Sequence, residues 1–166
     1  MPTQKDAYID ERGRTRWRQN DALADKLAEL HDFLVVGGYP ETHAARYRLL
    51  ARFISRHPER IDQIHAEGRL AEISGIGASV AVIIGEYLDT GTSTKFEDFA
   101  ETTPPSVLEL LLVPGIGVKT ARSLYGDHGL DSLARLQQAL EDGGLEGVKG
   151  MGPKTLEAIK DTTVPP

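Results

Sequence analysis

Cysteine is absent from this chain of 166 residues, which excludes disulfide scaffolds, thiolate zinc sites and cysteine nucleophiles. Long apolar runs are absent too, because the longest one, Val80–Ile84, is too short to cross a bilayer. The N-terminal segment has no apolar stretch typical of a signal peptide. We therefore expect a cytoplasmic protein that contacts no membrane, associated with the nucleoid if the source is bacterial or archaeal.

An excess of basic residues is also lacking. Lysine and arginine number 19 against 25 aspartates and glutamates, giving a formal charge of −6, whereas small DNA-binding domains are usually basic. Residues 1–19 are the exception, since four arginines alternate around Trp17. We predict a basic flexible arm there, which is either a solvated tail or a nucleic-acid contact with one stacking ring.

Motifs for metal-dependent, nucleotide-hydrolysing or nucleotidyl-transfer chemistry are missing. The five histidines form no His-x-x-x-His pair and are expected to be ordinary surface residues. No phosphate-binding loop of the ATPase type and no Asp-x-Asp pair occurs. We accordingly predict no catalytic residue from these patterns.

The apolar residues recur at helical rather than strand spacing, which predicts an all-α protein. Asn20 is a suitable N-cap for a first helix with Leu23, Leu27 and Leu30 on one face. A second helix is expected over 41–55 and a short third one over 59–66.

An internal repeat is the most informative feature of the sequence. Residues 70–81, 110–121 and 145–156 each contain a short apolar lead-in, a Gly-apolar-Gly triplet and the start of a new helix. The first glycines of the triplets lie 40 and 35 residues apart. One such triplet is weak evidence, but three with matching flanks indicate a repeated structural unit.

The repeated unit is suited to holding an anion. Glycine permits a positive φ at the turn, and the free N–H groups of the following helix favour negative charge. Lys119 and Lys154 follow the second glycine by two residues, and Ser79 holds that place in the first copy. The alternative is a tight turn between packed helices. The predicted phosphate contacts are Gly75, Gly77, Ser79, Gly115, Gly117, Lys119, Gly150, Gly152 and Lys154.

These repeats resemble helix-hairpin-helix motifs, and their order resembles the amino-terminal region of family X DNA polymerases. The matching motifs over residues 20–160 are Asn20-x-x-x-Ala24-x-x-Leu27-x-x-Leu30, Tyr47-Arg48, Ile73-Ser-Gly-Ile-Gly77, Glu86-Tyr-Leu88 and Val113-Pro-Gly-Ile-Gly-Val-Lys-Thr-Ala121. The resemblance implies a bundle of the polymerase beta N-terminal type. It places a lyase-type domain over 20–91 and a second helical subdomain with two hairpins over 92–166.

The resemblance also implies further site residues. Tyr47 and Lys95 occupy family positions of a phosphate pocket, with His43 and Arg46 nearby. Hairpins of this family hold Na⁺ or K⁺ on backbone carbonyls, and no other cofactor is expected. The implied cation ligands are the carbonyls of Ala71, Ile73, Ile76, Leu111, Val113 and Ile116.

Two departures from the family bear on activity. The lysine of lyase-active members, which forms a Schiff base, falls at Ile83, and an isoleucine cannot form an imine. The three aspartates of the family's palm domain have no counterpart here, so we expect no polymerisation from this chain alone. Whether the chain is a whole protein or a fragment stays open.

These features predict DNA binding without base specificity, at gaps or 5′-phosphate ends, in DNA repair and with a repair protein as a further partner. One alternative is a protein-interaction scaffold that has lost DNA binding. Another is an abasic-site lyase with a relocated lysine such as Lys26.

Overall fold

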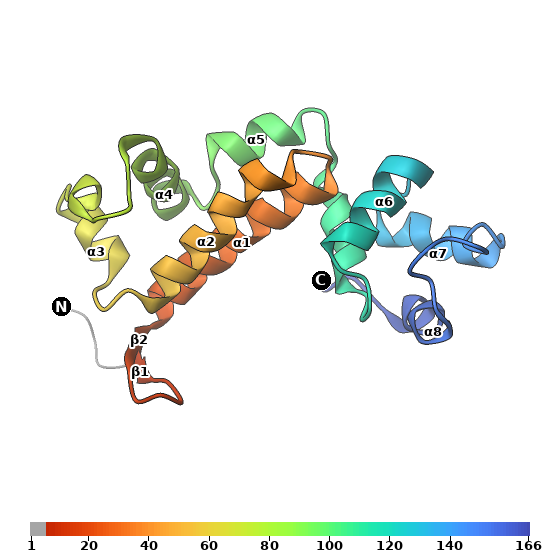
Figure 1. Ribbon diagram of the computed structural model, residues 1–166, viewed down its shortest axis with the longest axis horizontal. Coiled ribbons are helices and arrows are strands. Elements are labelled where there is room, and N and C mark those ends of the chain that lie inside the picture. The colour runs from red at the N-terminus through yellow and green to blue at the C-terminus, as the bar shows by residue number, and fades with distance from the viewer. Residues whose placement is uncertain (1–5) are drawn as a thin grey trace. The chain divides into compact units, whose positions relative to one another are not determined.

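The computed structural model describes residues 6–166, and most of them are helical, which confirms the predicted all-α class (Figure 1). In the described range, no helix is both long enough and apolar enough to cross a membrane. The elements in chain order are β1 (Ala7–Ile9), β2 (Thr15–Trp17), α1 (Arg18–Val36), α2 (Glu41–Arg56), α3 (Ile61–Ala66), η2 (Leu70–Glu72), α4 (Ala78–Thr90), α5 (Thr94–Ala100), η3 (Pro105–Leu112), α6 (Val118–His128), α7 (Leu133–Glu141) and α8 (Pro153–Asp161).

The chain divides into two compact units. The first unit contains the chain up to His31 together with Ala45–Asp98, and the second contains Asp32–Ala44 with Phe99–Pro166. This division differs from the predicted boundary after residue 91, because the end of α1 and the turn after it belong to the second unit. Phe33 packs edge-on against Phe99 at 5.1 Å between ring centroids. The Arg122 guanidinium donates to the Tyr39 carbonyl at 2.9 Å.

The first unit has its core between α1, α2, α3 and α4. The predicted stripe on α1 is buried as Leu23, Leu27 and Leu30, and Ile54 of α2 and Ile84 of α4 are fully buried as well. In the second unit, η3, α6, α7 and α8 all contribute buried aliphatic side chains, among them Leu110, Leu124, Leu136 and Ile159. Each unit therefore has an apolar core of its own.

The predicted flexible arm is wrong over residues 7–17, which form the antiparallel hairpin β1–β2 with Tyr8 opposite Arg16. The Arg16 guanidinium binds Asp10 at 2.8 Å and donates to the Ser55 carbonyl at 2.9 Å. The Trp17 indole N–H donates to the Pro58 carbonyl at 2.9 Å, so this side chain is held against the chain that follows α2. The Arg14 backbone N–H and the Arg16 guanidinium lower the pKa of Asp10 to about 2.

Asn20 is not the N-cap of the first helix, because α1 begins earlier, at Arg18. Its fully buried side chain instead fixes the segment before α3. The Oδ1 atom accepts the Ile61 N–H at 2.9 Å, and Nδ2 donates to the Glu59 carbonyl at 2.9 Å. One amide thus satisfies a donor and an acceptor of the backbone that leads into α3.

We expect Asn20→Ala to lower the free energy of unfolding by about 1–3 kcal/mol, because it removes the acceptor of the buried Ile61 N–H and a donor to the part-buried Glu59 carbonyl. Gln19→Ala is the control, since no described group bonds the buried Gln19 Oε1 atom, and it should change stability by less than about 0.5 kcal/mol. Urea titration followed by circular dichroism measures both. Equal losses in the two variants would contradict the role given to Asn20.

Candidate nucleic-acid interface

The three repeats, named hairpins 1 (70–81), 2 (110–121) and 3 (145–156), share one turn conformation. The first glycine has a φ of +93° at Gly75, +96° at Gly115 and +90° at Gly150. Residues with a Cβ rarely adopt this region, so the turn depends on glycine. The N–H of the residue between the glycines bonds back to the carbonyl three residues earlier, at 3.0 Å in the first two hairpins and 3.3 Å in the third.

The second glycine of each triplet precedes a helix and leaves its N-terminus uncapped by any side chain. Gly77, Gly117 and Gly152 have extended backbones at the starts of α4, α6 and α8, and none of these helix starts has a side-chain cap. The first-turn N–H groups therefore have no acceptor from a capping side chain. An anion placed there would receive these hydrogen bonds and the favourable end of the helix dipole.

Acidic residues avoid these helix starts. The first turns of α4, α6 and α8 contain no aspartate or glutamate. By contrast, α1, α2, α3 and α5 each have an acidic residue in the first turn, where it stabilises a helix. In a chain with 25 acidic residues, the hairpin helices thus keep their N-termini electropositive.

Hairpins 2 and 3 contact each other reciprocally within the second unit. A Cβ added to Gly115 would lie 2.7 Å from the Thr155 hydroxyl oxygen, and one added to Gly150 would lie 3.2 Å from the Thr120 hydroxyl oxygen. Thr120 and Thr155 occupy the same position in their hairpins, each directly after the predicted lysine. The two turns therefore pack against each other by equivalent contacts, with Lys119 and Lys154 exposed.

Hairpin 1 lies in the other unit and has no such contact. A Cβ added to Gly75 would meet nothing within 4 Å. Ser79 is exposed in the first turn of α4, and Ile83 is half-buried on the same helix. Lys95 is half-buried on α5.

Tyr47 is buried, with only 1% of the residue exposed. Its hydroxyl accepts a hydrogen bond from Arg46 at 2.6 Å, and the guanidinium carbon lies 4.7 Å from the ring centroid. The phosphate contact of Tyr47 stays a prediction. The exposed charge beside Tyr47 is the Arg46 guanidinium, which the Tyr47 hydroxyl and ring hold in position.

The predicted cation ligands are placed at the turns. Ile73 and Val113 directly follow the 3-10 helices that lead into the turns of hairpins 1 and 2, and their carbonyls accept the N–H groups of Ile76 and Ile116. The Ile76 and Ile116 side chains plug the turns, at 4% and 5% exposed. The monovalent cation stays a prediction. Across residues 6–166, histidine and carboxylate side chains form no cluster of three suited to a metal ion.

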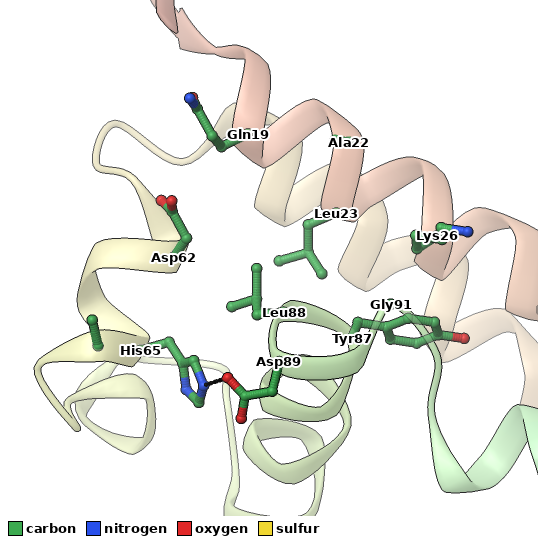
Figure 2. A pocket seen from close by; sticks show the side chains of 11 residues that line it. Gln19, Ala22, Leu23, Lys26, Asp62, His65, Tyr87, Leu88, Asp89 and Gly91 are labelled. Atoms are coloured by element: carbon green, nitrogen blue, oxygen red, sulfur yellow. Dashed lines mark hydrogen bonds and ion pairs between the residues drawn. The ribbon is translucent and has the colours of Figure 1, made fainter. Parts of the chain in front are cut away.

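A pocket of about 750 Å³ opens between α1, α3 and α4 of the first unit, with apolar walls that include Leu23 and Leu88 (Figure 2). The His65 Nε2 atom lies 2.9 Å from an Asp89 carboxylate oxygen at its edge. Lys26 also lines the pocket, but Figure 2 shows its amine directed away from the His65–Asp89 pair. The His65–Asp89 pair is therefore not placed beside the Lys26 amine.

Sequence comparison agrees with the repeated architecture. The sequence profile of the SAM-like helix-hairpin-helix tandem family matches residues 67–125 and again residues 107–163. The first match includes hairpins 1 and 2, and the second includes hairpins 2 and 3. The matches together cover more than half of the chain, which therefore belongs to this family.

A curated relative confirms the resemblance to family X polymerases. The DNA polymerase/3′-5′ exonuclease PolX of Bacillus subtilis (strain 168) is 33% identical to this chain over 90 residues. The aligned region is 54% of this chain and 16% of PolX. The chain thus corresponds to a small part of that relative.

Sequence reasoning missed two sets of residues. The first is the threonine pair Thr120 and Thr155, for which the repeated Lys-Thr dipeptide after each triplet was the available signal. The second is a row of exposed arginines on α2, visible in the sequence as a spacing of four residues: Arg48, Arg52 and Arg56.

We expect Gly115→Ala to lower the free energy of unfolding by about 2–4 kcal/mol, from backbone strain and from the contact with the Thr155 hydroxyl. Gly75→Ala, with the same strain but open space, should cost about 1–2 kcal/mol. The decisive measurement is a double-mutant cycle, because Gly115→Ala should cost less in a Thr155→Ala background. Additive losses would contradict the reciprocal contact.

Proposed function

We propose that this chain binds DNA through backbone phosphates without reading base sequence, as the DNA-holding part of a repair or processing system. The observation that carries the proposal is the reciprocal pair of hairpins 2 and 3. Each presents an uncapped helix N-terminus, a first turn free of acidic residues and an exposed lysine. These three features together suit a phosphodiester and provide nothing that distinguishes bases.

The pairing of the two turns gives the proposal its geometry. Because Thr120 and Thr155 each lie against the glycine turn of the other hairpin, Lys119 and Lys154 belong to two hairpins that pack side by side. Two linked phosphate contacts bind a polymer more tightly than either alone, since the second is formed within the complex. The negative net charge does not oppose this, because binding depends on the local charge at the contacts.

The printed name of the PolX relative, a DNA polymerase and exonuclease, supports DNA as the ligand. Only the DNA-holding role is proposed for this chain, since the aligned region is 16% of that relative. Gapped duplexes and 5′-phosphate ends are the proposed substrates. A Na⁺ or K⁺ ion on the carbonyls at hairpins 1 and 2 would bridge to phosphate, and a repair protein is the proposed further partner, in the cytoplasm or on the nucleoid.

Lys119→Gln and Lys154→Gln should each weaken binding to duplexes of different sequence by the same factor. Each should also reduce the slope of log affinity against log salt by about 0.9, because one phosphate contact is lost. Lys160→Gln is the matched control, since it removes an exposed lysine from the opposite end of α8. Fluorescence anisotropy over a salt titration measures both quantities. A variant that binds like the parent at every salt concentration would exclude its lysine from the interface.

The protein should form no covalent adduct with a 5′-deoxyribose-phosphate end in the presence of borohydride. Ile83 occupies the position where the family has its lysine, and Figure 2 shows the Lys26 amine directed away from the His65–Asp89 pair. Gel electrophoresis of the trapped reaction shows the result, with a lyase of known activity as the positive control. An adduct that disappears in Lys26→Ala would establish a relocated nucleophile.

A further inference from the structure

Helix α2 presents an exposed row of like charges. Arg48, Arg52 and Arg56 follow one another at intervals of four residues, which places them along one side of the helix. None of the carboxylates in the described part of the chain forms an ion pair with any of the three. Like charges at this spacing repel each other, and only Arg56, in the last turn of α2, is placed where a cation stabilises a helix. It is complementary to a polyanion.

An apolar strip runs beside the arginine row. Leu49 is 63% exposed and Phe53 is 39% exposed, although both are large hydrophobic side chains. The His57 ring supports the Phe53 ring from one side, at 5.6 Å between centroids. Leaving these two side chains in contact with water is unfavourable, so the strip is a candidate contact surface.

The apolar strip leads into a pocket of about 270 Å³ that also reaches hairpin 1. Phe53, Leu49 and Leu50 line it from α2, while Gly75 of the hairpin turn and Val80 of α4 line it from the other side. Arg46, which lies over Tyr47, also lines the pocket. An apolar pocket, an aromatic ring, an arginine and a turn that favours phosphate thus meet within the first unit.

We infer that this face of α2 binds an unpaired nucleotide strand, with one base in the pocket against Phe53, its phosphate at the turn of hairpin 1 and the strand following the arginine row. This assignment rests on the proposed function, because it takes hairpin 1 to be a phosphate site. A base in a duplex cannot enter such a pocket without leaving its stack, whereas an unpaired base has a free face. The site therefore selects single-stranded or gapped DNA over intact duplex.

The arginine row also explains how hairpin 1 can lack the lysine of the other hairpins, since it has Ser79 at that position. In hairpins 2 and 3 the cation comes from the helix after the turn, whereas in the first unit it comes from α2. An acidic amphipathic helix of a protein partner would match the arginine row and the apolar strip as well. The open turn at Gly75 and the aromatic ring favour a nucleotide, because together they match a phosphate and a base.

The test uses the full chain, a fluorescein-labelled single strand of mixed sequence and the same sequence as an intact duplex. Phe53→Leu keeps the apolar volume and removes the ring, and we expect it to weaken single-strand binding by roughly 5- to 150-fold. Phe53→Tyr should retain most of the affinity. Duplex binding should stay unchanged in both variants, because it depends on hairpins 2 and 3.

A 2-aminopurine base in the single strand reports stacking directly. Its fluorescence should be quenched by the parent and by Phe53→Tyr, but less by Phe53→Leu at saturating protein. Arg52→Gln should reduce the single-strand salt slope by about 0.7, whereas Arg69→Gln should not, because Glu67 already pairs with Arg69. Melting temperatures of all variants show whether a loss of binding reflects a loss of folding.

The outcomes separate this inference from the proposed function. Duplex binding that depends on Lys119 and Lys154, with single-strand binding insensitive to Phe53 and Arg52, would overturn the α2 site alone. A parent that binds neither form of DNA at low salt would overturn both. Binding of a Glu/Leu amphipathic peptide at this face, without single-strand binding, would make it a protein site and overturn the inference.

Discussion

The positive φ of the first glycine in each hairpin is the constraint on which the rest of the site depends. It reverses the chain within the triplet, so that a helix ends, an apolar residue plugs the gap and a new helix begins with its N–H groups uncovered. Any Cβ at Gly115 would both strain the backbone and displace the Thr155 side chain. The missing Cβ of the first glycine thus permits the turn conformation. In hairpins 2 and 3 it also leaves space for the threonine of the other hairpin.

Charge is distributed in a way that reconciles an acidic protein with a polyanionic ligand. Most helices outside the hairpins begin with an acidic residue, which stabilises a helix N-terminus, whereas the three hairpin helices do not. The hairpin helices give up that contribution to stability and keep their N-termini electropositive. The arginines of α2 lack ion pairs in the described residues, and they too remain available as cations. The net charge of −6 therefore says little about what these surfaces bind.

The repeat, the helical class and the placement of glycines were predictable from the sequence, because each depends on local periodicity or on a single residue type. The role of Asn20 was predicted wrongly, because its side chain does not cap a helix. It bonds instead to backbone groups about forty residues away, at Glu59 and Ile61. The hairpin at residues 7–17 was missed because Trp17 and Arg16 are fixed by carbonyls about forty residues away. Burial of Tyr47 under Arg46 likewise depends on tertiary packing, which no short motif encodes.

The three hairpins share one turn but differ in the side chains around it, namely in the cation beside the turn and in what packs against the first glycine. Hairpins 2 and 3 each supply a lysine and the threonine that fills the other's glycine gap. Hairpin 1 has neither, and its Gly75 borders a pocket lined by Phe53 and Arg46. Because the backbone of the turn is the same in all three, the difference lies in the neighbouring side chains. The same turn is thus accompanied by lysines and threonines in the second unit, and by an apolar pocket with an arginine in the first.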